Sequence, residues 1–260
     1  MGRAAAVRGR RLDVTKLRLL GWGALLALVA AAPMACRGPD TVHIATEGAY
    51  APYNFINDDG EIDGFERELG DELCRRAGLE CTWVINDWDS TIPNLVNGDF
   101  EAVMTGMSIT DERDEQIDFT QPYIPPSPSL YVALAGAGDA AASGVVAVQV
   151  ATIQADHLAG SGATLREYET VPEAIDAVLA GEADAALVDS GFALASVAES
   201  DGRLAVVGPQ VPLDRGVGIG VQEGDDDLRE KLDAAIGEMK ADGSLNALLR
   251  KWFGAEAETF

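Results

Sequence analysis

The chain has 260 residues, of which 47% are hydrophobic and 24% charged, so it can bury a core and is not a disordered polyelectrolyte. Its formal net charge of −24 at pH 7 argues against nucleic acids and anionic membrane surfaces as partners, because both would repel it. A cationic ligand and a saline habitat are both compatible with this charge.

The first 35 residues have the layout of a secretory signal peptide. Six basic residues end at Arg18, and an apolar run over residues 19–35 follows them. A transmembrane anchor is the alternative, but the run is short for one and contains Pro33. We therefore expect residues 1–35 to direct export to the periplasm or to the outer face of the cytoplasmic membrane.

Cys36 follows this run directly, as in bacterial lipoprotein cleavage sites, in which the cysteine becomes lipidated. Pro33 stands where such sites usually have Leu, so ordinary cleavage that leaves a free cysteine stays open. In the first case residues 36–40 form a tether, and the lipid is the protein's only contact with the membrane.

Cys74 and Cys81 bracket a corner at which a helix is expected to end at Gly78 and a strand to begin. A disulfide across this corner suits an oxidising compartment, and for so short a loop it contributes roughly 2–3 kcal/mol at most. Two buried thiols are the alternative.

Short apolar strands alternate with helices along the first half of the chain. Strands are expected at TVHIATEG (41–48), CTWVIN (81–86) and FEAVMTG (100–106), with helices that begin near Phe65 and at STIPNLVNG (90–98). Such alternation predicts an α/β fold with parallel sheets.

Two segments of the chain repeat one pattern. LVNGDFEAVMTG (95–106) and VLAGEADAALVDS (178–190) each read as a helix end, a glycine, an acid and a strand. Aligning Gly98 with Gly181 places Thr105–Met107 opposite Val188–Ser190, both just past a strand's carboxyl end. Ligands of open α/β sheets bind at such ends, so each half offers the same kind of edge.

Two extended segments, 121–133 and 211–222, are expected to cross between the halves and to form a hinge. Segment 133–144 reads as a flexible loop, and the chain ends in two helices separated by Gly243. We therefore predict one lobe from residues 41–125 plus 215–260 and a second from residues 126–214.

Three motifs carry a resemblance to a known family: GFERELGDEL (64–73), MTGMSITDER (104–113) and IDFTQPY (117–123). Over residues 42–254 the chain resembles the bacterial extracellular solute-binding proteins of family 3, which serve ABC importers of polar amino acids. The cysteine pair and WDSTIPNL (88–95) resemble the lysine/arginine/ornithine and histidine binders, and TGMSITDER is equally close to glutamine binders. The resemblance implies the two-lobe, type II periplasmic-binding-protein fold.

The resemblance implies a role for Arg113, which stands among four acids that are expected to face solvent. It matches the arginine that clamps the ligand's α-carboxylate, a task that suits the two parallel donors of a guanidinium. Asp189 matches the carboxylate that receives the α-ammonium, and an N-cap of the following helix is its alternative role. Further donors to the carboxylate are implied at Gly106, Met107, Ser108 and Thr152.

The ligand side chain is implied to meet four other residues. Tyr50 and Trp88 match an aromatic pair that sandwiches it, although each could equally be a core residue. Thr105 matches a position near it, and Glu47 matches an acid, usually Asp, that binds a distal cation. Ala151 replaces a family glycine beside Thr152, which places a Cβ on the backbone there.

The predicted function is capture of arginine, lysine, ornithine or histidine by a monomer that passes its ligand to the transmembrane subunits of an ABC permease. Glutamine or another polar amino acid is the alternative ligand. A cyclohexadienyl-dehydratase-like enzyme and a ligand-sensing receptor module are alternatives on the same fold. No cofactor or metal is expected, because His43 and His157 lack neighbours at metal-ligand spacing.

Overall fold

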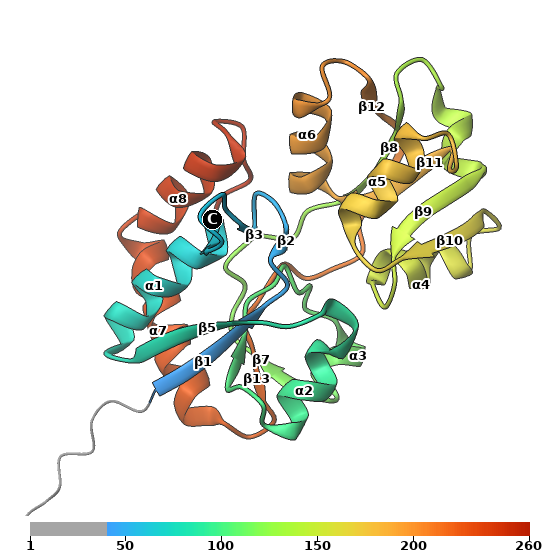
Figure 1. Ribbon diagram of the computed structural model, residues 1–260. Helices are drawn as coiled ribbons and strands as arrows, with labels where there is room; N and C mark the ends of the chain where they lie inside the picture. The colour runs from blue at the N-terminus through green and yellow to red at the C-terminus, as the bar shows by residue number, and fades with distance from the viewer. Residues whose placement is uncertain (1–40) are drawn as a thin grey trace, which may run out of the picture. The chain divides into compact units, whose positions relative to one another are not determined.

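A computed structural model describes residues 41–260 of the protein (Figure 1). The predicted signal peptide (1–35), the tether (36–40) and the lipidation of Cys36 lie outside these residues. Among the helices of residues 41–260, none is long and apolar enough to cross a membrane.

The first of two five-stranded sheets contains the strands Thr41–Thr46 (β1), Glu80–Ile85 (β5), Ala102–Val103 (β6), Ile117–Phe119 (β7) and Gly220–Gln222 (β13). They lie in the order β5-β1-β6-β13-β7, in which β1 is parallel to β5 and β6, and β13 is antiparallel to its neighbours. The helices that pack around this sheet are Phe65–Ala77 (α1), Thr91–Asn97 (α2), Asp226–Ala241 (α7) and Ser244–Phe253 (α8). In Figure 1, α1, α7 and α8 lie on one side of it and α2 on the other.

The second sheet contains Ser129–Leu134 (β8), Val145–Gln149 (β9), Thr164–Tyr168 (β10), Ala185–Asp189 (β11) and Leu204–Val211 (β12). Their order is β10-β9-β11-β8-β12, in which β9, β10 and β11 are parallel and β8 is antiparallel to both of its neighbours. Helices Val171–Leu179 (α5) and Ser190–Glu199 (α6) pack on one apolar face, and Ile153–Ala159 (α4) packs on the other.

The chain passes between the two sheets twice, from β7 to β8 and from β12 back to β13. An isolated bridge between Val217 and Ile124 joins the two crossing segments, and a second bridge joins Val217 to Ser108 in the loop after β6. The predicted α/β class and both crossovers are therefore observed, while the predicted lobe boundaries at 125/126 and 214/215, which fall in the crossing segments, stay predictions.

A third, small sheet precedes α1. Its strands are Ala49–Tyr50 (β2), Asn54–Ile56 (β3) and Ile62–Asp63 (β4), paired in that order. The aromatic segment around β2 and β3 thus forms a short antiparallel meander beside α1.

The corner after α1 has the expected form. Gly78 ends the helix in the left-handed conformation (φ 67°), and a disulfide joins Cys74 to Cys81. The disulfide prediction is confirmed, and the alternative of two free thiols is wrong.

Three local expectations need correction. Segment 133–144 is not a plain loop, because β8 continues to Leu134 and a 3-10 helix, Asp139–Ser143 (η2), follows, with Ala141 buried. The helix predicted at 90–98 is preceded by a 3-10 turn, Trp88–Ser90 (η1), and the strand predicted at 100–106 is reduced to β6. The helix predicted at 90–98 is thus present as α2, the strand predicted at 100–106 is shorter than expected, and the segment predicted as a loop contains regular structure.

The repeated pattern corresponds to equivalent positions in the two sheets. Gly98 and Gly181 both take left-handed conformations (φ 82° and 72°) after a helix, and β6 and β11 follow them. The segments just beyond these strands meet at one pocket, described next.

Candidate functional site

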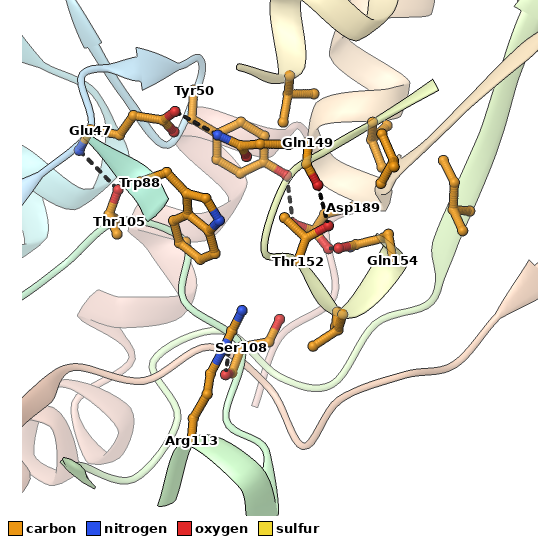
Figure 2. A pocket seen from close by; sticks show the side chains of 16 residues that line it. Glu47, Tyr50, Trp88, Thr105, Ser108, Arg113, Gln149, Thr152, Gln154 and Asp189 are labelled. Atoms are coloured by element: carbon orange, nitrogen blue, oxygen red, sulfur yellow. Dashed lines mark hydrogen bonds between the residues drawn. The ribbon is translucent and has the colours of Figure 1, made fainter. Parts of the chain in front are cut away.

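A pocket lies between the carboxyl ends of the two sheets (Figure 2). Nine of the ten predicted ligand-binding residues line it: Glu47, Tyr50, Trp88, Thr105, Gly106, Ser108, Arg113, Thr152 and Asp189. The exception is Met107, which packs into the core with Phe100 and Ile117. The cavity measures about 30 Å³, so the protein's own side chains nearly fill it in this conformation.

The loop after β6 is held from beneath by a buried carboxylate. Glu66 on α1 is fully buried and accepts hydrogen bonds from the Gly106 N–H (2.7 Å), from Asn54 Nδ2 (2.6 Å) and from the Tyr123 hydroxyl. Burial raises the pKa of Glu66. Sequence reasoning treated Glu66 only as part of a family motif and missed that it positions Gly106.

Gly106 itself could not carry a side chain without strain. Its backbone is left-handed (φ 65°), and a Cβ there would lie 3.0 Å from the Tyr50 ring. The loop therefore passes close to Tyr50 and leaves Ser108 and Thr105 facing the pocket.

Arg113 is the buried member of a short helix, Asp111–Asp114 (α3), whose N-cap Thr110 accepts the Arg113 N–H. The residue is 9% exposed, whereas the acids beside it are exposed, as predicted. Its guanidinium donates to the Ser108 carbonyl (2.9 Å) and weakly to the Ala151 carbonyl (3.5 Å), and lies 5.2 Å from the centre of the Trp88 ring.

No carboxylate neutralises this guanidinium within residues 41–260, in which none of the ion pairs includes Arg113. Burial lowers the pKa of Arg113, and the nearest acids only partly offset that effect. An arginine nevertheless stays charged in proteins, so the pocket contains a positive charge without a direct counter-ion.

Asp189 stands at the end of β11, in the N-cap position of α6, but its side chain accepts no hydrogen bond from that helix. Its carboxylate instead accepts from the Tyr50 hydroxyl (2.5 Å) and from Gln154 Nε2 (2.7 Å). The alternative role as a capping side chain is thus wrong. Burial of the carboxylate raises its pKa to about 6.

The opposite end of the pocket pairs Glu47 with Gln149, a residue that sequence reasoning missed. Gln149 Nε2 donates to Glu47 Oε1 (2.6 Å) and to the Glu169 carbonyl (2.9 Å). Burial raises the pKa of Glu47 to about 7, and the charges of Asp87 and Glu66 add to the effect. Glu47 is therefore a carboxylate that is poorly stabilised as long as only a neutral amide faces it.

The two predicted aromatic residues do not form a sandwich in this conformation. Tyr50 is stacked between Tyr53 (4.8 Å between ring centres) and Phe192 (5.0 Å), so both of its faces are covered. It presents its hydroxyl to the pocket instead. Trp88 places its ring beside Arg113 and its N–H against the second lobe.

Two hydroxyls that were expected to bind a ligand carboxylate make bonds within the protein. Thr152 caps α4 by accepting from the Ala155 N–H and donates to the Gln149 carbonyl (2.8 Å). Ser108 donates to Asp214 Oδ2 (3.0 Å), a carboxylate of the second crossover that sequence reasoning did not identify. No residue type or spacing in the sequence marked Asp214, because its partner lies 106 positions away.

Residues 41–260 contain no group of three or more His, Cys, Asp or Glu side chains that could hold a metal ion. The pocket contains the cation of Arg113 and the carboxyl groups of Asp189 and Glu47. Amide and hydroxyl groups also line it, and little free space remains.

Comparison with known proteins places this chain in a family. The sequence pattern of the bacterial extracellular solute-binding proteins, family 3, matches residues 42–255. The chain belongs to this family. It is 30% identical to the histidine-binding periplasmic protein of Escherichia coli K12, over 92% of this chain and 97% of that protein. It is 32% identical to the L-arginine-binding protein of Pseudomonas aeruginosa, over 92% and 96%.

A solved structure is more similar still. It is a periplasmic His/Glu/Gln/Arg/opine family-binding protein from Silicibacter pomeroyi in complex with lysine, with 60% identity and a TM-score of 0.81. The match covers 84% of this chain and all of that one. The predicted family and the two-lobe, type II periplasmic-binding-protein fold are both confirmed.

Proposed function

We propose that this protein binds a free α-amino acid between its lobes, with Arg113 on the α-carboxylate and Asp189 on the α-ammonium. The observation that carries the proposal is a pair of opposite charges, the buried Arg113 and the partly buried Asp189, neither of which has an ion-pair partner among residues 41–260. A buried charge without a partner costs several kcal/mol. One zwitterionic ligand would supply both missing partners at once.

The ligand would replace contacts that the protein makes with itself. An α-ammonium has three donors and would take the place of the Tyr50 hydroxyl at Asp189. A carboxylate would accept from the free edge of the Arg113 guanidinium, and Ser108 would turn from Asp214 toward it. Because the cavity of about 30 Å³ is too small for an amino acid, binding requires the lobes to open and then close around the ligand.

A basic amino acid is our preferred ligand. Glu47 lies at the other end of the pocket, and a ligand cation would stabilise its ionised form better than the neutral Gln149 amide does. The names of the relatives, which mention histidine, arginine and lysine, support the same class. Glutamine is the second candidate, since Gln149 shows that an amide fits against Glu47.

The remaining parts of the proposal concern the cellular setting. We expect the chain to be exported by residues 1–35, anchored by a lipid on Cys36, and to deliver its ligand as a monomer to an ABC permease. Binding rather than catalysis is its expected activity, without a cofactor.

Thermal-shift titration of the purified protein with all common amino acids, ornithine and prephenate tests the proposal. A ligand that binds only the folded state stabilises it, by about 2.7 kcal/mol at a concentration of 100 Kd. We expect shifts with arginine, lysine, ornithine or histidine. A shift with glutamine alone would replace basic amino acids with glutamine as the assigned ligand. A response to prephenate alone would contradict the amino acid proposal.

A further inference from the structure

The indole N–H of Trp88 crosses from one lobe to the other. Trp88 lies in η1, beside the first sheet, and its Nε1 donates to the carbonyls of Val150 (3.0 Å) and Ala151 (3.2 Å), just after β9 of the second sheet. Figure 2 shows the ring between the two lobes with the Arg113 guanidinium below it. The bond therefore exists only while the lobes are together.

The acceptor segment has an unusual backbone. Ala151 adopts a left-handed conformation (φ 54°) that residues other than glycine rarely take. The Ala151 carbonyl also faces Arg113 Nη2 at 3.5 Å. Trp88 and Arg113 thus approach the same carbonyl while the ring and the guanidinium contact each other.

The other tryptophans of residues 41–260 differ from Trp88 in this respect. Trp83 donates its N–H to Asp71 on α1 (3.0 Å), and Trp252 donates to Glu68 on the same helix (2.8 Å). Both bonds lie within the first lobe. Among these three tryptophans, only Trp88 donates its indole N–H to the opposite lobe.

We propose that Trp88 is an interlobe latch, whose indole N–H holds the closed state through the Val150 and Ala151 carbonyls and whose ring positions Arg113 for the ligand. This role rests on the proposed amino acid binding only for one of its two tests, the dissociation rate of the ligand. The latch also acts without ligand, because neither acceptor belongs to a ligand.

Two replacements of Trp88 separate the N–H from the ring. Trp88→Phe removes the N–H and reduces the ring, and replacement by 3-benzothienylalanine keeps a bicyclic ring but has no N–H. Trp83→Phe is the matched control, since it loses an equivalent N–H bond inside one lobe. Melting temperatures verify that each variant folds.

The first measurement is small-angle X-ray scattering of the ligand-free proteins. Both Trp88 variants should have a larger radius of gyration than the wild type, because they lose the bond that favours closure, and Trp83→Phe should not. The second is the dissociation rate of the amino acid found by thermal shift. We expect both Trp88 variants to release it roughly 3- to 10-fold faster, the effect of one neutral hydrogen bond.

The results separate the latch from the proposed ligand. If no amino acid binds the wild type, the proposed function fails, yet the scattering comparison still tests the latch. Ligand-free dimensions and dissociation rates of both Trp88 variants that equal those of Trp83→Phe would overturn it. A change with Trp88→Phe but not with 3-benzothienylalanine would assign the effect to the ring and also exclude a hydrogen-bond latch.

Discussion

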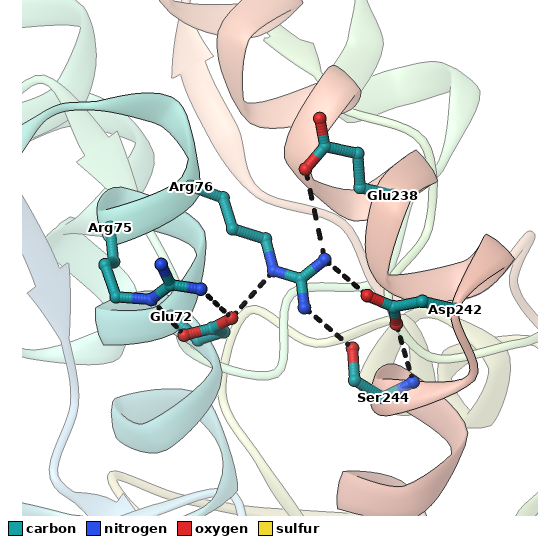
Figure 3. Close-up of polar contacts among 6 residues, drawn as sticks. All are labelled: Glu72, Arg75, Arg76, Glu238, Asp242 and Ser244. Atoms are coloured by element: carbon teal, nitrogen blue, oxygen red, sulfur yellow. Dashed lines mark hydrogen bonds and ion pairs between the residues drawn. The ribbon is translucent and has the colours of Figure 1, made fainter.

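Two arginines of this protein are held in opposite ways. Arg76, at the end of α1, is surrounded by partners from three helices: Glu72 (2.7 Å), Asp242 (2.7 Å) and Ser244 (3.2 Å), with Glu238 at 3.9 Å (Figure 3). Arg113, in the pocket, is more buried and has carbonyls and an aromatic ring as neighbours, with no carboxylate paired to it among residues 41–260.

The carboxylates of the two regions differ in the same sense. Hydrogen bonds from Arg75 and Arg76 lower the pKa of Glu72 to about 2, and bonds from Ser244 and Arg76 lower that of Asp242 to about 2. In the pocket, burial raises the pKa of Glu47 to about 7 and that of Asp189 to about 6. The charged side chains at the corner of α1, α7 and α8 pair with one another, whereas those of the pocket have no ion-pair partner among residues 41–260, which is what the proposed ligand would supply.

Removing each arginine tests this difference most directly. Arg113→Ala should weaken binding of every amino acid by roughly 100-fold or more, because a buried, charged partner of the ligand is lost. Its ligand-free stability should stay unchanged or rise, since an unpaired buried charge disappears. Arg76→Ala should do the reverse and lower the melting temperature while leaving affinity unchanged.

Isothermal titration calorimetry and thermal melts of both variants make the comparison. Wild-type affinity in Arg113→Ala would contradict its assignment as the carboxylate clamp. A loss of affinity in Arg76→Ala equal to that in Arg113→Ala would show that general destabilisation, and not the pocket charge, controls binding.

The pH dependence sharpens the comparison. A carboxyl group whose pKa is raised by folding contributes stability below its unfolded pKa and loses it as the pH rises through the folded pKa. For Glu47 and Asp189 this loss falls between about pH 4 and pH 7. Glu72 and Asp242 act in the opposite direction and only below about pH 4, where their lowered pKa values make acid destabilising.

We therefore expect the ligand-free melting temperature to fall from pH 5 to pH 8, while the affinity for a basic amino acid rises, because the ligand cation needs ionised Glu47. Glu47→Gln should remove most of the pH dependence above pH 6 and weaken binding of lysine or arginine by about 10- to 100-fold, the effect of one charged hydrogen bond. Binding of glutamine should change little. Titrations at pH 5, 6, 7 and 8 measure both effects, and an unaltered preference for basic amino acids would exclude Glu47 as their cation partner.

Much of the fold followed from local sequence signals. The apolar runs and glycines that predicted α1, α2, α7 and α8 act within a few residues, as Gly78 and Gly243 do by ending or separating helices. Segment 133–144 was misjudged because its helical turn depends on a distant contact, the bond from the Gly208 N–H to Asp139.

The site residues also differ in whether they follow from local sequence signals or from distant contacts. The loop around Ser108 and Arg113 was predicted because its residues are contiguous in a motif. Gln149, Gln154 and Asp214 were missed because each meets its partner across the pocket, 102, 35 and 106 positions away. The Tyr50–Trp88 sandwich was expected from a resemblance, which does not encode that Phe192 of the second lobe stacks on Tyr50.

The smallest expected effect concerns the backbone of the two regions. The corner after α1 uses a glycine at positive φ, Gly78 (67°), whereas the pocket uses Ala151 (54°). A left-handed conformation costs a residue with a Cβ about 1–2 kcal/mol. Glycine avoids this cost, but it loses more conformational entropy on folding, which offsets part of the gain in stability. Ala151→Gly should therefore raise the free energy of unfolding by about 0.5–1 kcal/mol.

Urea denaturation of Ala151→Gly, with Gly78→Ala as the reciprocal control, measures this effect. Gly78→Ala should be destabilised, because it places a Cβ on a residue with a left-handed backbone. Gly78 lies outside the pocket, so binding should not change. Binding should survive in Ala151→Gly, since the carbonyl that faces Trp88 and Arg113 is a backbone atom. If Ala151→Gly is more stable but binds more weakly, the restricted backbone of the alanine is needed to keep the residue 151 carbonyl in place. If Ala151→Gly is less stable, the left-handed backbone at residue 151 is not strained.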